Sequence, residues 1–200
     1  MPTGSGTPPS PALSPLSFYA VEERLGFAEK RANELFALNG GDLIHAESSP
    51  RQQLVQEFFF HLLGAIDVFA QFVNEQRVLG HDPQDVSIGY LHDKITPTTD
   101  PLDRALRELY VNPKRSPLPS DPYSDDGYLY RAYNYRHHVT HRRMNPWLFR
   151  MGSVPPVSFI LDPRVHPGNG PNHSVLSYDD EMQAMLDLVD KRVRAAKAAI

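Results

Sequence analysis

The chain has 200 residues, of which 40% are hydrophobic and 22% are charged, and its formal net charge is −4. This length and composition are typical of one globular domain with its own core. Because cysteine is absent, disulfides, thiol nucleophiles and sulfur-based zinc sites are excluded. No apolar stretch approaches the roughly 18 residues that span a bilayer, and the N-terminus lacks the features of a secretory signal. We therefore expect a soluble, cytoplasmic protein that does not enter a membrane.

The N-terminal half of the chain contains the clearest helical patterns. Residues 1–16 are rich in Pro, Ser, Gly and Thr, which predicts a disordered tail before a single domain of residues 17–200. Apolar residues recur every three or four positions in residues 17–39, which end at an Asn-Gly-Gly sequence, and in residues 50–79. In the second segment the repeat comprises Val55, Phe59, Leu62, Ile66, Phe69 and Val73. This spacing predicts two long helices with a phenylalanine-rich core.

Prolines interrupt the middle of the chain. Residues 81–122 should therefore form irregular connections with short helical pieces, such as residues 101–110. A further long helix is predicted for residues 124–144. Ser124 is a suitable N-cap, two aspartates follow it beside the positive end of the helix dipole, and Pro146 lies just beyond the expected end.

The C-terminal part of the chain is predicted to contain one more helix, residues 177–199, with basic residues toward its end. Residues 157–161 form a short β-type run that allows one small hairpin. Packing these segments most simply gives an all-α fold. We expect an antiparallel bundle of four to five helices with long irregular connections.

The helix predicted for residues 124–144 is unlike the others because it is aromatic, basic and histidine-rich. Residues 127–161 contain no Asp or Glu, yet they contain the following cationic or titratable side chains: Arg131, Arg136, Arg142, Arg143, Arg150, His137, His138 and His141. Such a concentration of positive charge in a mildly acidic protein indicates a surface for a polyanion.

Arg136 is the most informative of these residues. At about 100° per residue, it projects from the apolar side of its helix, close to Leu129 and Ala132. A guanidinium keeps its charge, so it must reach water, a carboxylate or a bound phosphate. Glu57 and Asp67 of the preceding long helix are candidate internal partners.

The sequence RHHVTH, from Arg136 to His141, resembles the R-x4-6-H motif of the HEPN superfamily. The sequence FFFHLLGAIDVFAQFVN, residues 58–74, resembles the helix patterning of bacterial members. The resemblance implies a helical bundle that forms homodimers, sometimes with a neutralising protein partner. It also implies RNA binding or metal-independent endoribonuclease activity without a cofactor. By this resemblance, Arg136 would stabilise the phosphate, His141 would transfer protons, and His137 would orient or assist.

Helical geometry limits this motif. Residues 136 and 141 are about 140° apart around an ideal helix and about 7.5 Å apart along it. They would share a face only if the helix distorts or if two subunits form a composite site. Four further arginines would contact the RNA backbone and one tyrosine would stack on a base: Arg131, Arg142, Arg143, Arg150 and Tyr130. For the tyrosines as a group, packing against neighbouring helices is the favoured interpretation, because aromatic rings at helical spacing usually belong to the core.

Two other functions fit the same residues. The pairs His137–His141 and Glu57–His61 have i, i+4 spacing on two helices, so together they could bind a divalent metal. Alternatively, the chain is a non-catalytic dimeric interaction module, in which Arg136 forms a structural ion pair. Whether Arg136 and His141 lie in one open basic cleft distinguishes these hypotheses.

Overall fold

The computed structural model describes residues 17–39, 48–94, 99–141, 147–149, 157–159 and 174–200. The elements within these ranges are α1 (Tyr19–Asn39), α2 (Ser48–Gln76), α3 (Ile88–Lys94), α4 (Pro101–Glu108), α5 (Asp125–His141), β1 (Trp147–Phe149), β2 (Val157–Phe159) and α6 (Tyr178–Lys197). The all-α fold is confirmed, and β1 and β2 pair antiparallel as one small hairpin. The segment predicted to be a disordered tail, residues 1–16, lies outside the described residues.

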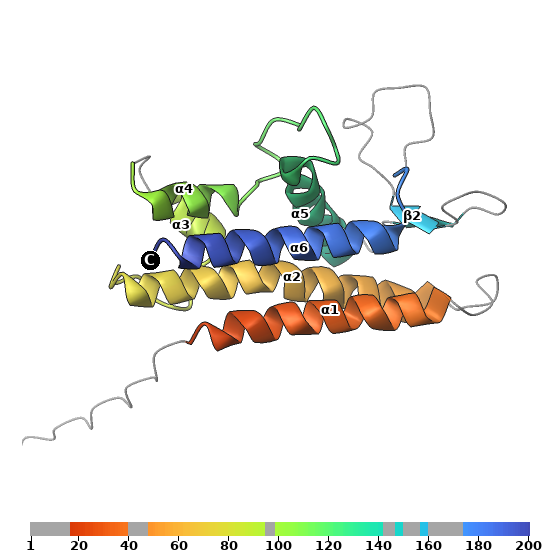
Figure 1. Ribbon diagram of the computed structural model, residues 1–200, viewed down its shortest axis with the longest axis horizontal. Helices are drawn as coiled ribbons and strands as arrows, with labels where there is room; N and C mark the ends of the chain where they lie inside the picture. Colours follow the sequence, from red (N-terminus) through yellow and green to blue (C-terminus); the bar gives the residue numbers. More distant parts are fainter. Residues whose placement is uncertain (1–16, 40–47, 95–98, 142–146, 150–156, 160–173) are drawn as a thin grey trace, which may run out of the picture.

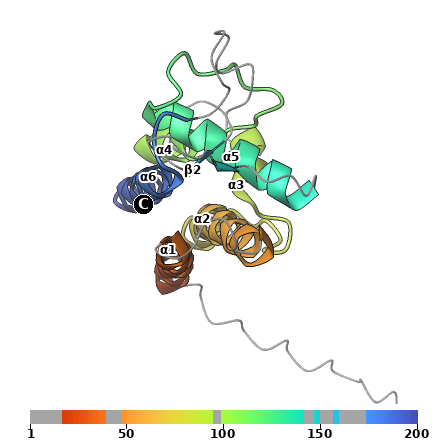
Figure 2. The ribbon, with the colours of Figure 1, turned by 90° about the vertical axis from the view of Figure 1, so that its right-hand side faces the viewer.

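The long helices differ in arrangement from a fully antiparallel bundle. Helices α1, α2 and α6 have nearly parallel axes, whereas α5 crosses over α2 and α6 (Figures 1 and 2). The ends of α2 and α6 meet where Arg77 donates a hydrogen bond to the carbonyl of Ala199 (3.2 Å). The end of α6 also meets the start of α1, where Lys197 Nζ lies 3.7 Å from the ring centroid of Phe18. Because α5 crosses instead of returning along the bundle, α6 runs in the same direction as α2.

One hydrophobic core joins all six helices. Helix α2 lies at its centre and buries the predicted stripe, from Val55 to Val73, together with Phe58, Leu63, Ala65 and Ala70. Each large apolar side chain that is fully buried contributes about 1.5–3 kcal/mol to stability. Within the described ranges, every helix is too short or too polar to traverse a lipid bilayer.

Helices α4 and α6 each begin at a side chain that caps the N-terminus of the helix. Asp100 caps α4 by accepting a hydrogen bond from the backbone N–H of Leu102 (2.8 Å). Ser177 caps α6 in the same way, because its hydroxyl accepts a hydrogen bond from the backbone N–H of Asp180 (3.2 Å). Each such side-chain acceptor satisfies a backbone N–H that has no partner inside the helix.

Candidate nucleic-acid interface

Helix α5 carries the predicted motif on one unbroken helix. The hydroxyl of Ser124 accepts a hydrogen bond from the backbone N–H of Gly127 (3.1 Å), so the predicted N-cap is confirmed. Position 127 has no room for a side chain, because a Cβ there would overlap the carbonyl of Asp121. The helix then continues without interruption to His141.

Arg136 lies at the edge where α5 crosses α2. Its Nη1 is 3.5 Å from Oδ2 of Asp67, and both side chains are about one third exposed (34% and 31%). The other oxygen of Asp67 accepts a hydrogen bond from the backbone N–H of Ile88 (3.1 Å) and thereby fixes the start of α3. Asp67 is thus the internal partner of Arg136. Glu57, the other candidate, instead pairs with Arg31 of α1 (2.7 Å).

Two residues predicted to contact RNA are buried in the core. The side chain of Arg131 is 1% exposed and its Nη1 is 2.6 Å from Oε2 of Glu181, which is fully buried. Tyr130 is also 1% exposed, and its hydroxyl donates to the carbonyl of Pro113 (3.1 Å). The predicted RNA contacts of Arg131 and Tyr130 are therefore wrong, because neither side chain can reach a ligand at the surface.

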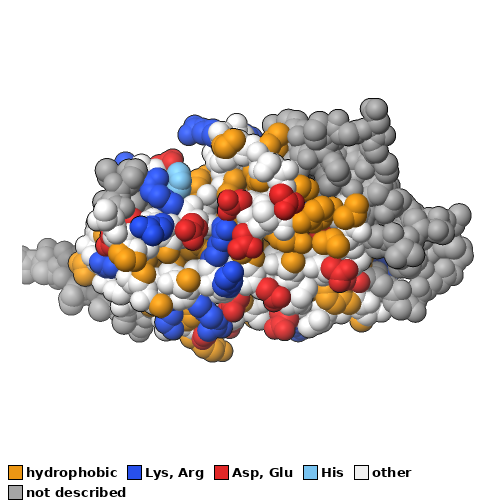
Figure 3. Space-filling view, turned by 45° about the horizontal axis from the view of Figure 1, so that its top comes forward, with side chains coloured by type: hydrophobic (Ala, Val, Ile, Leu, Met, Phe, Trp, Pro, Cys, Tyr) orange, Lys and Arg blue, Asp and Glu red, His pale blue; other side chains and the backbone are white. Residues whose placement is uncertain are grey.

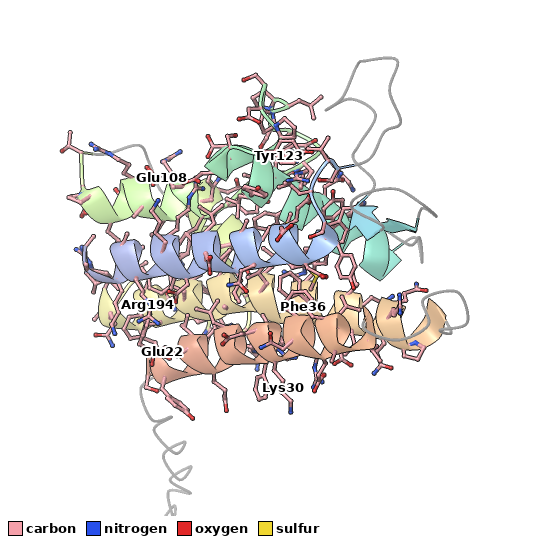
Figure 4. The ribbon with its side chains drawn as sticks, turned by 45° about the vertical axis from the view of Figure 1, so that its right-hand side comes forward. Glu22, Lys30, Phe36, Glu108, Tyr123 and Arg194 are labelled. Carbon is pink, nitrogen blue, oxygen red and sulfur yellow. The ribbon has the colours of Figure 1, made fainter. Side chains whose placement is uncertain are left out.

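Tyrosine rings surround the buried guanidinium of Arg131. Its Cζ lies 5.1 Å from the ring centroids of both Tyr123, which precedes α5 (Figure 4), and Tyr128. Burial raises the pKa of Glu181, although the Arg131 charge and the hydroxyl of Ser174 oppose this shift. A charged pair in such surroundings orients α5 against α6, and it has no access to a ligand.

Two further tyrosines of α5 also belong to the protein interior. The hydroxyl of Tyr133 donates to the carbonyl of Leu109 (3.0 Å), and burial, with a smaller effect from Asp67, raises its pKa well above the usual value. The ring of Tyr135 is 2% exposed and stacks on Phe159 with centroids 4.7 Å apart. Neither phenol can act as a base near neutral pH. Core packing is thus the correct interpretation for these rings.

The histidines of the motif are only partly visible in the structure. His137 directly follows Arg136 and is partly buried. His141 is the last residue of α5, and its side chain lies outside the described residues. The other predicted backbone contacts also lie outside them: Arg142, Arg143 and Arg150. Because α5 is an unbroken α-helix, positions 136 and 141 remain about 140° apart.

The alternative metal site is not assembled among its described residues, and the side chain of His141 lies outside them. Glu57 pairs with Arg31, and Nδ1 of His61 accepts a hydrogen bond from Arg24 (3.2 Å), so both side chains face α1. Burial, then the charges of Arg24 and Arg31, lower the pKa of His61. His137 belongs to α5 (Asp125–His141), whereas the partners of Glu57 and His61 belong to α1. The described part of the chain contains no group of three or more potential metal ligands.

Charges of both signs share the face formed by α4, α5 and α6. Figure 3 shows Lys and Arg interspersed with Asp and Glu over these helices. The pairs at this seam include Lys191 with Asp125 (3.8 Å) and Arg192 with Asp126 (3.0 Å). Such a face repels a polyanion about as much as it attracts one, so the cations near α2 are better candidates for a nucleic-acid contact.

A cluster of exposed aromatic residues beside α2 has no counterpart in the sequence predictions. Phe60 is 53% exposed and Phe27 of α1 is 39% exposed, with His61 between them (ring centroids 5.3 and 5.2 Å away). The guanidinium of Arg24 lies 5.2 Å from the ring centroid of Phe60. One signal was available: at about 100° per residue, Phe60 lies about 140° from the centre of the helical stripe that contains Phe59, whereas the buried Phe58 lies about 60° from it.

Comparisons of the chain with protein-family models, with curated proteins and with solved structures found no match.

Proposed function

We propose that this protein is a HEPN-like RNA-binding protein whose contact with the RNA backbone is centred on Arg136. The observation that supports this proposal is the partly exposed guanidinium at the crossing of α5 and α2, which Asp67 holds at 3.5 Å. A carboxylate that orients an arginine reduces the entropy lost on binding, and the planar guanidinium matches phosphate oxygens.

Binding is better supported than cleavage. Cleavage through the 2′-hydroxyl needs a base and an acid as well as a cation. His137 directly follows Arg136, which keeps a metal-independent endoribonuclease as the second candidate. His141 would enter such a site most easily from the partner subunit of a homodimer, since it lies about 140° from Arg136 around α5. A dimer without RNA, or with a neutralising protein partner, is the remaining alternative.

The proposal can be tested by fluorescence polarisation with a labelled single-stranded RNA over a series of salt concentrations. Arg136→Ala should weaken binding about 10- to 100-fold, the range for a hydrogen-bonded charged contact. It should also reduce the slope of log K against log salt by about 0.7, the value for one phosphate contact on a single strand. Arg194→Ala is the matched control, because Arg194 pairs with Glu22 and Asp190 at the α1–α6 side (Figure 4).

Two results would contradict RNA binding at Arg136. One is a wild-type protein that binds no RNA at low salt, and the other is an equal effect of Arg136→Ala and Arg194→Ala. Incubation of the same RNA with wild type, Arg136→Ala and His141→Ala in EDTA tests the second candidate. Cleavage that both substitutions abolish would support a ribonuclease. Cleavage that survives both would refute a role for the motif.

A further inference from the structure

The exposed aromatic cluster adjoins the surface at Arg136. We call it the aromatic platform and define it as Arg24, Phe27, Phe60, His61 and Gly64. Within it, Arg24 lies over the ring of Phe60 and donates a hydrogen bond to His61. A Cβ at Gly64 would have one heavy atom within 4 Å, Nη1 of Arg24 at 4.0 Å, so the helix surface beside Phe60 is open.

The platform and Arg136 approach the same stretch of α2 from two sides. Arg24 comes from α1 and reaches Gly64, whereas Arg136 comes from α5 and reaches Asp67. Gly64 and Asp67 are three residues apart, so they lie on the same face of α2, about 4.5 Å apart along the helix. One extended ligand that crosses this face of α2 can therefore contact both arginines.

The charge of Arg24 is not compensated within the described part of the chain. No carboxylate there lies within ion-pair distance of Arg24, whereas the neighbouring Arg31 pairs with both Glu34 and Glu57. His61 accepts a hydrogen bond from Arg24, and burial together with the arginine charges lowers its pKa, so its imidazole is neutral at pH 7. The platform thus combines an exposed aromatic face with one uncompensated positive charge.

These properties favour an anionic ligand with flat aromatic groups. Unpaired RNA bases stack on aromatic rings and on guanidinium planes, and the phosphates beside them provide the negative charge. A second copy of the chain is a poorer occupant, because a two-fold symmetric contact centred on the platform would place the two Arg24 charges opposite each other. Duplex RNA is also a poor fit, because its bases are already stacked within the helix.

We propose that the aromatic platform stacks an unpaired base of an RNA strand whose backbone is bound at Arg136. This inference rests on the proposed function, and it specifies single-stranded RNA as the ligand of that surface.

The test uses a 12-nucleotide polyadenylate with one 2-aminopurine, whose fluorescence is quenched when the base stacks. Phe60→Leu removes the ring but keeps an apolar side chain at a position that is 53% exposed, so folding should be retained. We expect Phe60→Leu to weaken binding about 5- to 150-fold, the range for one base–aromatic stack, and to reduce the quenching. The matched control is Tyr19→Leu, because Tyr19 is 67% exposed and lies outside the platform.

The outcomes separate this inference from the proposed function. If Arg136→Ala weakens binding and Phe60→Leu does not, the platform proposal is wrong and RNA binding at Arg136 stands. An equal affinity of the wild type for the polyadenylate and for its duplex with polyuridylate would also overturn the platform proposal. If the wild type binds no RNA, both proposals fail. A change in sedimentation with Phe60→Leu would then assign the platform to contacts between proteins.

Discussion

The buried pair of Arg131 and Glu181 can be tested by removing one charge and then both. Glu181→Gln keeps the shape of the side chain but leaves a guanidinium of 1% exposure without a negative partner. Breaking a buried pair in this way costs about 3–5 kcal/mol. Replacing both partners, by Arg131→Met with Glu181→Leu, removes both buried charges. The free energy of unfolding of this double variant should be unchanged or higher than wild type by about 1–4 kcal/mol.

The contacts of the pair explain this contrast. One hydrogen bond of 2.6 Å joins the two side chains, but Nε and Nη2 of Arg131 and Oε1 of Glu181 have no hydrogen-bond partner among the described residues. The cost of removing the charges from water is therefore only partly offset. Stacking of Arg131 between Tyr123 and Tyr128 at 5.1 Å opposes the replacement, because each cation–π contact contributes about 0.5–2 kcal/mol. Methionine recovers part of this packing.

Urea denaturation followed by circular dichroism measures the free energy of unfolding of both variants. The matched control is Asp190→Asn. Asp190 also belongs to α6, and its Oδ1 forms an exposed ion pair with Nε of Arg194 (2.8 Å). An exposed pair contributes at most about 1 kcal/mol. If Glu181→Gln costs no more than Asp190→Asn, the pair is not a determinant of stability. If the double variant loses as much stability as Glu181→Gln, removing the second charge does not relieve the loss of the first.

Two further predictions concern His61 and the helical glycines. Burial, more than the nearby arginines, lowers the pKa of His61 below 6.5 in the folded state, so unfolding takes up a proton as the pH falls below that value. The free energy of unfolding should therefore decrease between about pH 7 and about pH 5.5, with a smaller decrease in His61→Gln, as measured by urea denaturation at both pH values. Gly26→Ala and Gly64→Ala should each raise the free energy of unfolding by about 1 kcal/mol, because alanine favours helix and the nearest atom to either added methyl is no closer than 4.0 Å. Gly89→Ala should raise the free energy of unfolding by less than this, because its Cβ would lie 3.1 Å from the ring of Tyr110. An increase as large as that of Gly26→Ala in the same denaturation assay would show that the ring moves aside freely.

Helical periodicity predicted the long helices because their core residues are local in sequence. The segment predicted as 50–79 is α2 (Ser48–Gln76), and the segment predicted as 177–199 is α6 (Tyr178–Lys197). Helix α3 was predicted only as one of several short helical pieces without bounds, because it is short and its start depends on a contact between Ile88 and Asp67, 21 positions earlier. Such a contact leaves no periodic signal.

The environment of each charge on α5 was harder to predict than the helix itself. Arg131 was assigned to contact with the RNA backbone with the other arginines, because its acidic partner among the described residues, Glu181, is 50 positions away in the sequence. Arg136 was different, since its position on the apolar side of the helix required water, a carboxylate or a bound phosphate as its partner, and Asp67 was one of two candidate carboxylates. A charge that must lie on an apolar face is thus easier to place than one that is simply part of a basic segment.

The spacing of the charged positions on α5 explains why one helix has both a structural and a surface arginine. Arg131, Arg136 and His141 follow each other at intervals of five residues, and each interval turns about 140° around the helix. Arg131 points to Glu181 of α6 inside the bundle, whereas Arg136 points to Asp67 at the edge of α2. Position 141 is turned by the same angle again. The two arginines of this helix therefore lie in two different environments, whereas the side chain of His141 lies outside the described residues. If the proposed function is correct, binding at Arg136 would need one copy of α5, whereas cleavage with His141 would need two.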